Sequence, residues 1–274
     1  MRSPRPLAAA AAAAAALATR AAAAPAPERG YGLPRDVSLD GARVDELLHF
    51  TLLATVTIFV VVLGAMAFSF LRHGRAHPAR YTHGSRRSVG VLVATVAVIA
   101  FGVDVTMFVR TLLDLNGHFW NFARAEEQPG AVRIEVNAHQ WAWAVRYPSA
   151  QGEFNSADDV VTLNDVRVPA GVPVVIQLAS TDVIHSFYLP NFRVKRDAVP
   201  GMINSITFQG REPGEYEIAC AQHCGPNHYK MRGILTVLAP EDYRRWLETA
   251  RADARRGYDA TDSEAHWGWA WRKE

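Results

Sequence analysis

The sequence predicts a membrane-anchored all-β protein, in which an N-terminal two-helix transmembrane hairpin precedes a β-sandwich and a C-terminal helix. Two long apolar stretches predict the hairpin, and a series of short β-rich runs between residues 131 and 240 predicts the sandwich. The 274 residues carry a formal net charge of +2, which excludes a dedicated nucleic-acid binder. Two cysteines in the whole chain exclude a disulfide-dense secreted scaffold.

Residues 1–24 predict a secretory signal peptide. Arg2 and Arg5 precede an uncharged apolar run from Leu7 to Ala18, and the alanines at 21–24 provide small residues for cleavage. The alternative is an alanine-rich tail of low complexity.

Residues 40–115 predict the transmembrane hairpin, with spans at about 47–71 and 88–110. The first span contains no Asp, Glu, Lys or Arg. As a helix it is about 37 Å long at ~1.5 Å per residue, which exceeds a hydrocarbon core of ~30 Å. The second span carries a single acid, Asp104, which indicates a polar contact with a neighbouring subunit. Two buried helices of a soluble protein are the alternative.

The connection between the two spans is basic, since it contains no acid and five arginines, at positions 72, 75, 80, 86 and 87. By the positive-inside rule this loop lies in the cytoplasm. Everything after the second span then faces the periplasm, in agreement with the signal peptide. We therefore expect a multi-pass protein of a bacterial inner membrane, with its β-domain on the periplasmic side of the lipid bilayer.

Residues 125–240 predict the β-sandwich. Runs rich in Val, Ile, Thr and aromatic residues recur at roughly regular spacing and are bounded by Gly, Pro, Asn and Asp. Residues 241–274 predict a C-terminal helix and a tail, because Pro240 suits the first turn of a helix and the apolar residues that follow fall on one face. The tail ends in an aromatic run from His266 to Arg272, which none of the predicted elements explains.

Both cysteines belong to a cluster with the pattern C-x3-C-x3-H-x2-M, formed by Cys220, Cys224, His228 and Met231. His185, at the end of a predicted strand, is the candidate for a further ligand. Two thiolates, imidazoles and a thioether form a soft set of donors, which selects copper over magnesium, calcium or manganese. A mononuclear blue-copper site needs one cysteine, so the second thiolate favours a pair of bridged copper ions that transfers electrons rapidly.

Three other interpretations of the cluster remain open at this point. Cys220 and Cys224 could form a short-loop disulfide in an oxidising compartment. They could bind zinc, although methionine is a poor zinc ligand and the C-x3-C spacing is unusual for zinc sites. His228 and Met231 could be packed loop residues without a metal.

The cluster, together with segments 139–143, 182–187 and 195–201, resembles subunit II of haem–copper cytochrome c oxidase over roughly residues 40–250. The resemblance implies a cupredoxin domain with a binuclear CuA centre of two copper ions. Such a subunit accepts electrons from a separate c-type cytochrome and passes them to the haem of subunit I. There dioxygen is reduced to water, coupled to proton translocation. The implied partners are subunit I, subunit III and the cytochrome donor.

The resemblance assigns the metal ligands as the side chains of His185, Cys220, Cys224, His228 and Met231 and the backbone carbonyl of Gln222. The two thiolates would bridge both ions, each imidazole would bind one, and the thioether and the carbonyl would be axial ligands. Trp141 matches the family's electron-entry tryptophan, with a core tryptophan as the alternative. Trp143 is a possible part of the route, and Asp182 matches an acid that docks the donor.

Three positions depart from the family pattern. Gln222 replaces an acid that helps to hold magnesium at the subunit I boundary, and a neutral amide is a weaker ligand for this hard cation. Arg146 stands where an acid of the docking rim is expected. Val89 stands where a glutamate that feeds protons to subunit I is expected.

Two further functions compete with the electron-entry subunit of a terminal oxidase. The first is the CuA subunit of a nitric oxide reductase, and the second is a membrane-anchored copper carrier. A disulfide-stabilised β-domain that only binds partners is a weaker alternative. A buried loop with bridging thiolates beside a tryptophan pair favours electron transfer over copper delivery. The chain has no C-x-x-C-H motif, so the electron donor is expected to be a separate protein.

Overall fold

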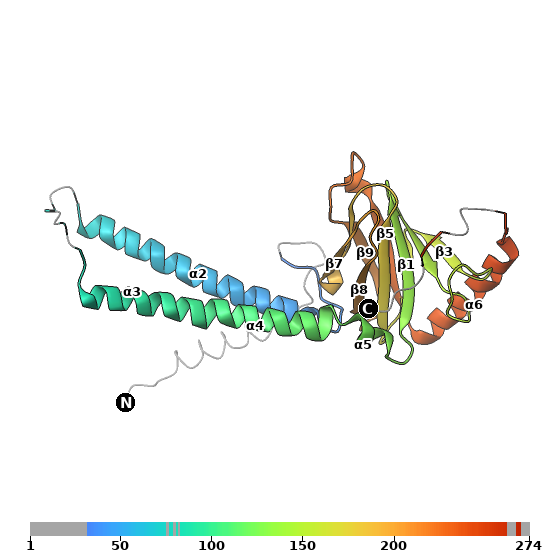
Figure 1. Cartoon of the computed structure of the whole chain (residues 1–274), viewed down its shortest axis with the longest axis horizontal. Helices are drawn as coiled ribbons and strands as arrows, with labels where there is room; N and C mark the ends of the chain where they lie inside the picture. Colours follow the sequence, from blue (N-terminus) through green and yellow to red (C-terminus); the bar gives the residue numbers. More distant parts are fainter. Residues whose placement is uncertain (1–31, 75–76, 79–80, 82, 262–266, 270–274) are drawn as a thin grey trace, which may run out of the picture. The chain divides into compact units, whose positions relative to one another are not determined.

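The computed structural model describes residues 32–74, 77–78, 81, 83–261 and 267–269 (Figure 1). The signal peptide predicted over residues 1–24 lies outside these described residues. Of these described residues, those from Val37 onward belong to one compact unit.

Two long apolar helices begin the described part of the chain. The first is α2 (Gly41–Arg72). The second runs continuously from Arg86 to Phe119 and consists of α3 (Arg86–Ile99), the π-helical turn η1 (Ala100–Asp104), α4 (Val105–Asp114) and the π-helical turn η2 (Leu115–Phe119). After a break at Trp120 and Asn121, the short helix α5 (Phe122–Glu126) follows. Both of the long helices are apolar enough to cross a membrane. The hydroxyl of Thr51 contacts the sulfur of Met107 at 3.7 Å, where α2 packs beside α4.

Both helices extend beyond the predicted spans of 47–71 and 88–110. The absence of charge marks the part of a helix that lies in lipid, whereas the helix itself continues until its backbone hydrogen bonding ends. The second helix begins where the side chain of Ser85 accepts a hydrogen bond from the backbone N–H of Ser88 at 3.1 Å. That cap satisfies one of the free N–H groups of the first turn.

Residues 83–261 contain two five-stranded sheets that form a sandwich. The first has the order β3-β2-β1-β5-β8 and the second the order β4-β10-β9-β6-β7. The strands are β1 (Val132–His139), β2 (Ala142–Tyr147), β3 (Val160–Leu163), β4 (Asp165–Pro169), β5 (Pro173–Ser180), β6 (His185–Leu189), β7 (Val194–Ala198), β8 (Asn204–Gln209), β9 (Gly214–Cys220) and β10 (Arg232–Leu238). The β1–β5 and β4–β10 pairs are parallel, and the other strand pairs are antiparallel.

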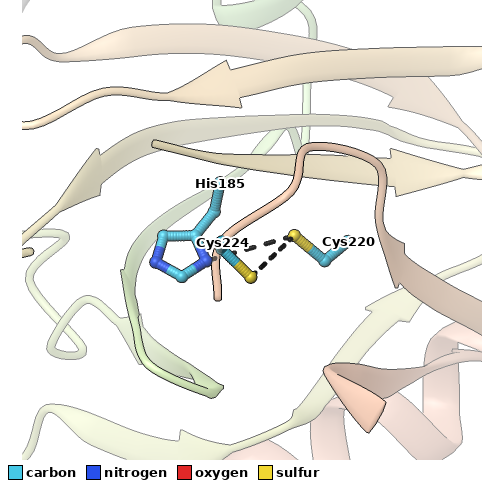
Figure 2. A group of neighbouring side chains, drawn as sticks. All are labelled: His185, Cys220 and Cys224. Carbon is cyan, nitrogen blue, oxygen red and sulfur yellow. Dashed lines mark hydrogen bonds between the residues drawn. The ribbon is translucent and has the colours of Figure 1, made fainter. Parts of the chain in front are cut away.

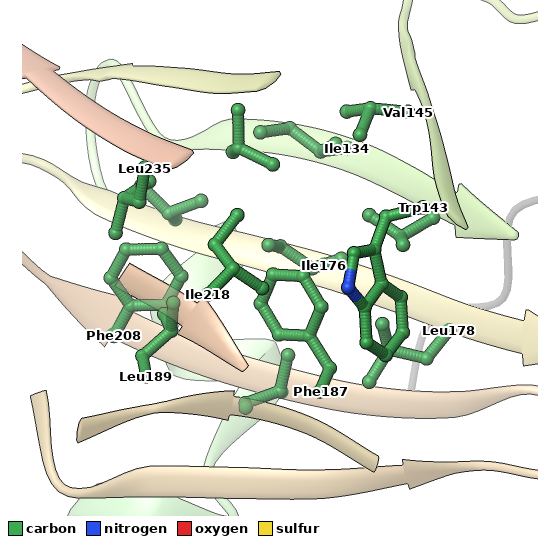
Figure 3. Close-up of a cluster of buried hydrophobic side chains, with 14 of the residues drawn as sticks. Ile134, Trp143, Val145, Ile176, Leu178, Phe187, Leu189, Phe208, Ile218 and Leu235 are labelled. Atoms are coloured by element: carbon green, nitrogen blue, oxygen red, sulfur yellow. The ribbon is translucent and has the colours of Figure 1, made fainter. Parts of the chain in front are cut away.

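Alternating residues of the two sheets meet in one core (Figure 3). In β1, Ile134 and Val136 point inward, and in β5, Ile176 and Leu178 do the same. They face Phe187 and other fully buried side chains of the second sheet. This alternation fixes the register, because a shift by one residue would turn the whole apolar set toward water.

The C-terminal helix α6 (Pro240–Gly257) closes one side of the sandwich. Pro240 occupies the first turn, as predicted. Trp246 packs edge-on against Tyr147 of β2, with ring centroids 5.2 Å apart. Arg251 donates hydrogen bonds to the carbonyls of Pro148 and Ser149. Two apolar helices, a two-sheet sandwich and a C-terminal helix together confirm the predicted fold class.

Ile176→Ala should lower the free energy of unfolding by about 2–5 kcal/mol, because it leaves a cavity at a fully buried position of β5. Ile234→Ala is the matched control on β10, where the side chain is 50% exposed, and it should cost about 1 kcal/mol or less. Denaturant unfolding of the full chain in detergent measures both. Equal losses for the two variants would contradict the packing described.

Candidate metal centre

Two segments converge at one end of the sandwich, and they carry the predicted metal ligands. His185 is the first residue of β6, Cys220 is the last residue of β9, and Met231 directly precedes β10. The backbone N–H of Cys220 donates to the carbonyl of Met231 at 3.2 Å, which closes the intervening loop at its base. The N–H of Ala221 donates to the carbonyl of Ser186 at 3.0 Å, and this bond ties the loop to β6.

The ligand atoms of His185, Cys220 and Cys224 lie within 4.8 Å of one another (Figure 2). The two sulfurs are 3.7 Å apart, and both cysteines are free, so the structure does not contain the alternative disulfide. His228 places Nδ1 3.5 Å from Sγ of Cys224. Met231 places its sulfur 3.7 Å from Cys224 Sγ and 3.1 Å from His185 Nδ1. The predicted side-chain ligands therefore face one small volume.

The backbone carbonyl of Gln222 also points into this group, since its oxygen lies 3.2 Å from Sγ of Cys220. Its amide side chain belongs to an exposed residue. The donors are thus two sulfurs of cysteine, two imidazole nitrogens, a thioether and a carbonyl. This soft set fits copper, whereas zinc sites are usually built from four Cys, His or carboxylate ligands.

Asp182 fixes the orientation of His185. Its carboxylate contacts Nε2 of the imidazole at 2.9 Å, which leaves Nδ1 directed at the sulfurs. The same carboxylate accepts hydrogen bonds from the backbone N–H groups of Gln140 and Val183, both at 2.6 Å. Partners of this kind hold a metal-binding imidazole in place. Burial opposes ionisation of Asp182, but the hydrogen bond from His185 and the two backbone bonds lower its pKa below the ordinary value.

The two thiols differ in acidity. Burial works against a thiolate at Cys220, but hydrogen bonds with His185 and with the backbone lower its pKa to about 6. Burial and the neighbouring sulfur of Cys220 raise the pKa of Cys224. One thiol therefore ionises readily, and its negative charge opposes ionisation of the second. A bound cation removes that opposition, so metal binding and loss of both protons are coupled.

The loop between Cys220 and Met231, here called the metal loop, is covered by the β1–β2 turn of the other sheet. The indole N–H of Trp141 donates to the carbonyl of Cys224 at 3.1 Å, and the amide of Gln140 donates to the same oxygen at 2.8 Å. Gly225 makes this approach possible. Its φ is +116°, and a Cβ atom there would lie 2.8 Å from Nε2 of Gln140 and 3.3 Å from the Trp141 ring.

Trp143 lies in the core behind the predicted metal ligands. Its side chain is fully buried and meets His185 and Phe187 edge-on, with ring centroids 6.0 Å and 5.2 Å apart. Trp141 is only partly buried, so of the two tryptophans it is the one that reaches the surface beside the loop. Asp104 ends the turn η1 with an exposed side chain.

Arg146 requires a correction. The sequence comparison placed it on a docking rim, but the side chain is fully buried on the outer face of β2 and lies beside Asp159. It therefore contributes no charge to an exposed rim.

The sequence reasoning missed Gln140 and the orienting role of Asp182. Asp182 precedes His185 by three residues, a spacing that lets the carboxylate reach the ring across a turn and could have indicated this contact. For Gln140 the sequence offered only its position beside Trp141, because its partner Cys224 lies 84 residues away.

A model of the family described as cytochrome C oxidase subunit II, periplasmic domain, matches residues 132–238, from the start of β1 to the end of β10. The chain is 30% identical over 241 residues to the alternative cytochrome c oxidase subunit 2 of Bradyrhizobium diazoefficiens. This alignment covers 77% of the present chain and 81% of that protein. It is 29% identical over 231 residues to cytochrome c oxidase subunit 2 of Cereibacter sphaeroides, covering 73% of each. The crystal structure of the periplasmic domain of subunit II of cytochrome oxidase of Bradyrhizobium japonicum covers 44% of this chain and 94% of that one, at 27% identity and a TM-score of 0.40.

Gly225→Ala should destabilise the domain more than Gly201→Ala. Both positions have positive φ, which costs a residue with a side chain about 1–2 kcal/mol, but only Gly225 has close neighbours. Displacing Gln140 and Trp141 removes two hydrogen bonds of about 0.5–1.5 kcal/mol each. The difference between the variants in free energy of unfolding should be about 1–3 kcal/mol. Indistinguishable values would show that the contact of the β1–β2 turn with the loop is dispensable.

Proposed function

The chain belongs to the cytochrome c oxidase subunit II family, and on this premise we propose that it is the electron-entry subunit of a respiratory terminal oxidase. Family membership confirms the resemblance found in the sequence motifs. The two candidate membrane helices and the match to a periplasmic-domain family support a membrane-anchored protein with a periplasmic domain. The finer assignment is a multi-pass protein of a bacterial inner membrane.

The observation that supports this function best is the convergence of the soft donors at one end of the sandwich. His185, Cys220 and Cys224 place their ligand atoms within 4.8 Å of one another, and His228 and Met231 approach Cys224 from the same loop. We assign this site to two copper ions, which the two cysteine sulfurs would hold jointly, together with His185, His228, Met231 and the carbonyl of Gln222. When bound, the copper pair supplies a centre that accepts and releases one electron.

The protein's own contribution is to hold these donors still and to exclude water. His185, Cys224 and Met231 are buried, and Asp182 prevents rotation of the His185 ring. A rigid site costs little reorganisation when charge changes, which favours rapid electron transfer. A copper carrier needs accessible ligands that can be exchanged, so the burial of this site supports electron transfer over copper delivery.

Trp141 is the proposed entry point for electrons. Its indole is partly exposed on one side and donates to the carbonyl of Cys224 on the other, so a single hydrogen bond joins the surface to a ligand residue. Trp143 lies behind His185 and is a secondary route. Asp182 stays a candidate for docking the donor. Although it contacts His185, 30% of its side chain is exposed.

The proposed partners follow from the family. They are a haem-bearing subunit I and subunit III in the membrane, and a separate c-type cytochrome as donor. Subunit I would carry out reduction of dioxygen to water with proton translocation. The donor is a separate protein because this chain has no C-x-x-C-H motif for c-type haem. We assign no magnesium to Gln222, whose neutral amide suits a hard cation poorly. A nitric oxide reductase would use the same copper site and differs in the reaction of the assembled complex.

The full chain, loaded with copper in detergent, should bind two copper ions. Cys220→Ser should lose the paired centre, because it removes a bridging sulfur. Met231→Leu should keep both ions and change mainly the reduction potential, since an axial thioether is a weak ligand. Metal analysis and electron paramagnetic resonance measure these outcomes. An isolated single copper in the wild type, or equal copper content and spectra in wild type and Cys220→Ser, would contradict the bridged pair.

Trp141→Phe in the assembled complex should slow reduction of the copper centre by cytochrome c by roughly tenfold or more, which corresponds to about 1.4 kcal/mol in the barrier. The copper spectrum should stay unchanged, because Trp141 is not a ligand. Trp120→Phe is the control, since Trp120 is 54% exposed and lies outside the β-domain. Stopped-flow mixing with reduced cytochrome c measures the rate. An unchanged rate for Trp141→Phe would move the entry point elsewhere.

A further inference from the structure

A three-residue segment, Trp267 to Trp269, lies across the outer face of the first sheet. The guanidinium of Arg146 sits over the Trp267 ring, 4.3 Å from its centroid. The indole N–H of Trp269 donates to the side-chain oxygen of Gln177 at 2.8 Å. These contacts belong to the aromatic run that the sequence analysis left without an explanation.

The segment covers one row of polar side chains. Glu135 of β1 is paired directly with Arg146 of β2 on one side and with Gln177 of β5 on the other. All three point outward from the sandwich, and all three are fully buried. Side chains on the outer face of a sheet are normally in water. Burial of a row of this kind therefore requires a cover, and residues 267–269 lie directly against it.

Gly268 lets the segment approach the row. Its φ is +124°, and a Cβ atom would lie 2.5 Å from Oε2 of Glu135 and 3.2 Å from Nη1 of Arg146. A side chain at this position would meet both charged groups. The glycine between the two tryptophans is thus required by both backbone conformation and space.

The charged groups around Glu135 come from several elements. Arg146 faces it from β2, and a carboxylate oxygen of Asp159 lies 3.8 Å from Nε of Arg146. Arg146 also donates a hydrogen bond to Asn155. On β1 itself, Arg133 donates to the carbonyl of Gly152 at 2.5 Å.

Burial raises the pKa of Glu135 to about 7, because its effect outweighs the positive charge of Arg146, which lowers that pKa. Negative charge on Asp159 adds to the increase. Without the cover, the carboxyl group would meet water and its pKa would return toward the ordinary value. The covered form therefore holds a proton more tightly than the uncovered form. By linkage, the equilibrium favours the covered form at low pH, and this preference decreases as the pH rises through about 7.

We propose that residues 267–269 form a strap, which closes over Glu135 and Arg146 and is released as the surrounding pH rises. The strap contacts the row through the guanidinium of Arg146, the side chain of Gln177 and the close approach of Gly268 to Glu135. Because two of these contacts involve the charged groups of the row, a change in the charge of Glu135 shifts the equilibrium of the strap. Glu135 and Arg146 lie on the two arms of the β1–β2 hairpin, whose turn carries Trp141.

The strap can be observed in the metal-free full chain in detergent, so its test does not depend on the proposed copper site. The chain is labelled with 5-fluorotryptophan, and Trp267→Phe and Trp269→Phe identify the two fluorine resonances. Between about pH 6 and pH 8 the equilibrium constant for closure should fall about tenfold, as linkage to a carboxyl with a pKa of about 7 requires. Both resonances should move together toward the solvent-exposed position.

Two variants separate a proton-controlled strap from a fixed part of the sandwich. Glu135→Gln should keep the strap closed and remove its pH dependence, because the amide is neutral and similar in shape. Gly268→Ala should release the strap at every pH. Gly257→Ala is the matched control in α6, where a Cβ atom would meet nothing within 4 Å, and it should behave as the wild type.

The proposal is wrong if the wild-type resonances do not respond to pH. It is also wrong if the response persists in Glu135→Gln, or if Gly268→Ala leaves the strap closed.

Discussion

The backbone N–H of Cys220 donates to the carbonyl of Met231 where the β9–β10 ladder ends and the metal loop begins. This pairing sets the distance between the two ends of the loop before any metal binds. The neighbouring ladder pairs Phe187 of β6 with Cys220, which carries His185 to the same end of the sandwich. Core packing holds both ladders in register, so the candidate centre depends on the sandwich as a whole.

Charge and burial then decide what this end of the sandwich can hold. The sulfurs of Cys220 and Cys224 lie 3.7 Å apart, and ionisation of the first makes ionisation of the second harder. Asp182 turns one imidazole toward them, and Trp141 binds the Cys224 carbonyl from the other sheet. Burial also disfavours a charged group on the outer face of the first sheet, where it raises the pKa of the covered carboxyl group of Glu135.

Sequence patterns predicted the parts that depend on local order. Apolar runs predicted the two helices, and alternation with turn residues predicted the sandwich. The spacing of soft donors from Cys220 to Met231 predicted the ligand loop. Contacts between distant segments were not predictable, because no pattern marks which loops meet. The bond from Gln140 to Cys224 and the strap over Glu135 are of this kind, and for the same reason Arg146 was placed on the surface although it is buried. The helices also continue past the predicted spans, since hydropathy marks only the part of a helix that suits lipid.

The central proposal is that the two cysteine sulfurs would jointly hold a pair of copper ions. X-ray absorption spectroscopy at the copper edge of the loaded full chain tests it most directly, because it reports the neighbours of each copper atom. The account predicts that each copper has two sulfur neighbours, an imidazole nitrogen and a second copper close by. A copper atom with one sulfur neighbour and no copper neighbour would contradict it.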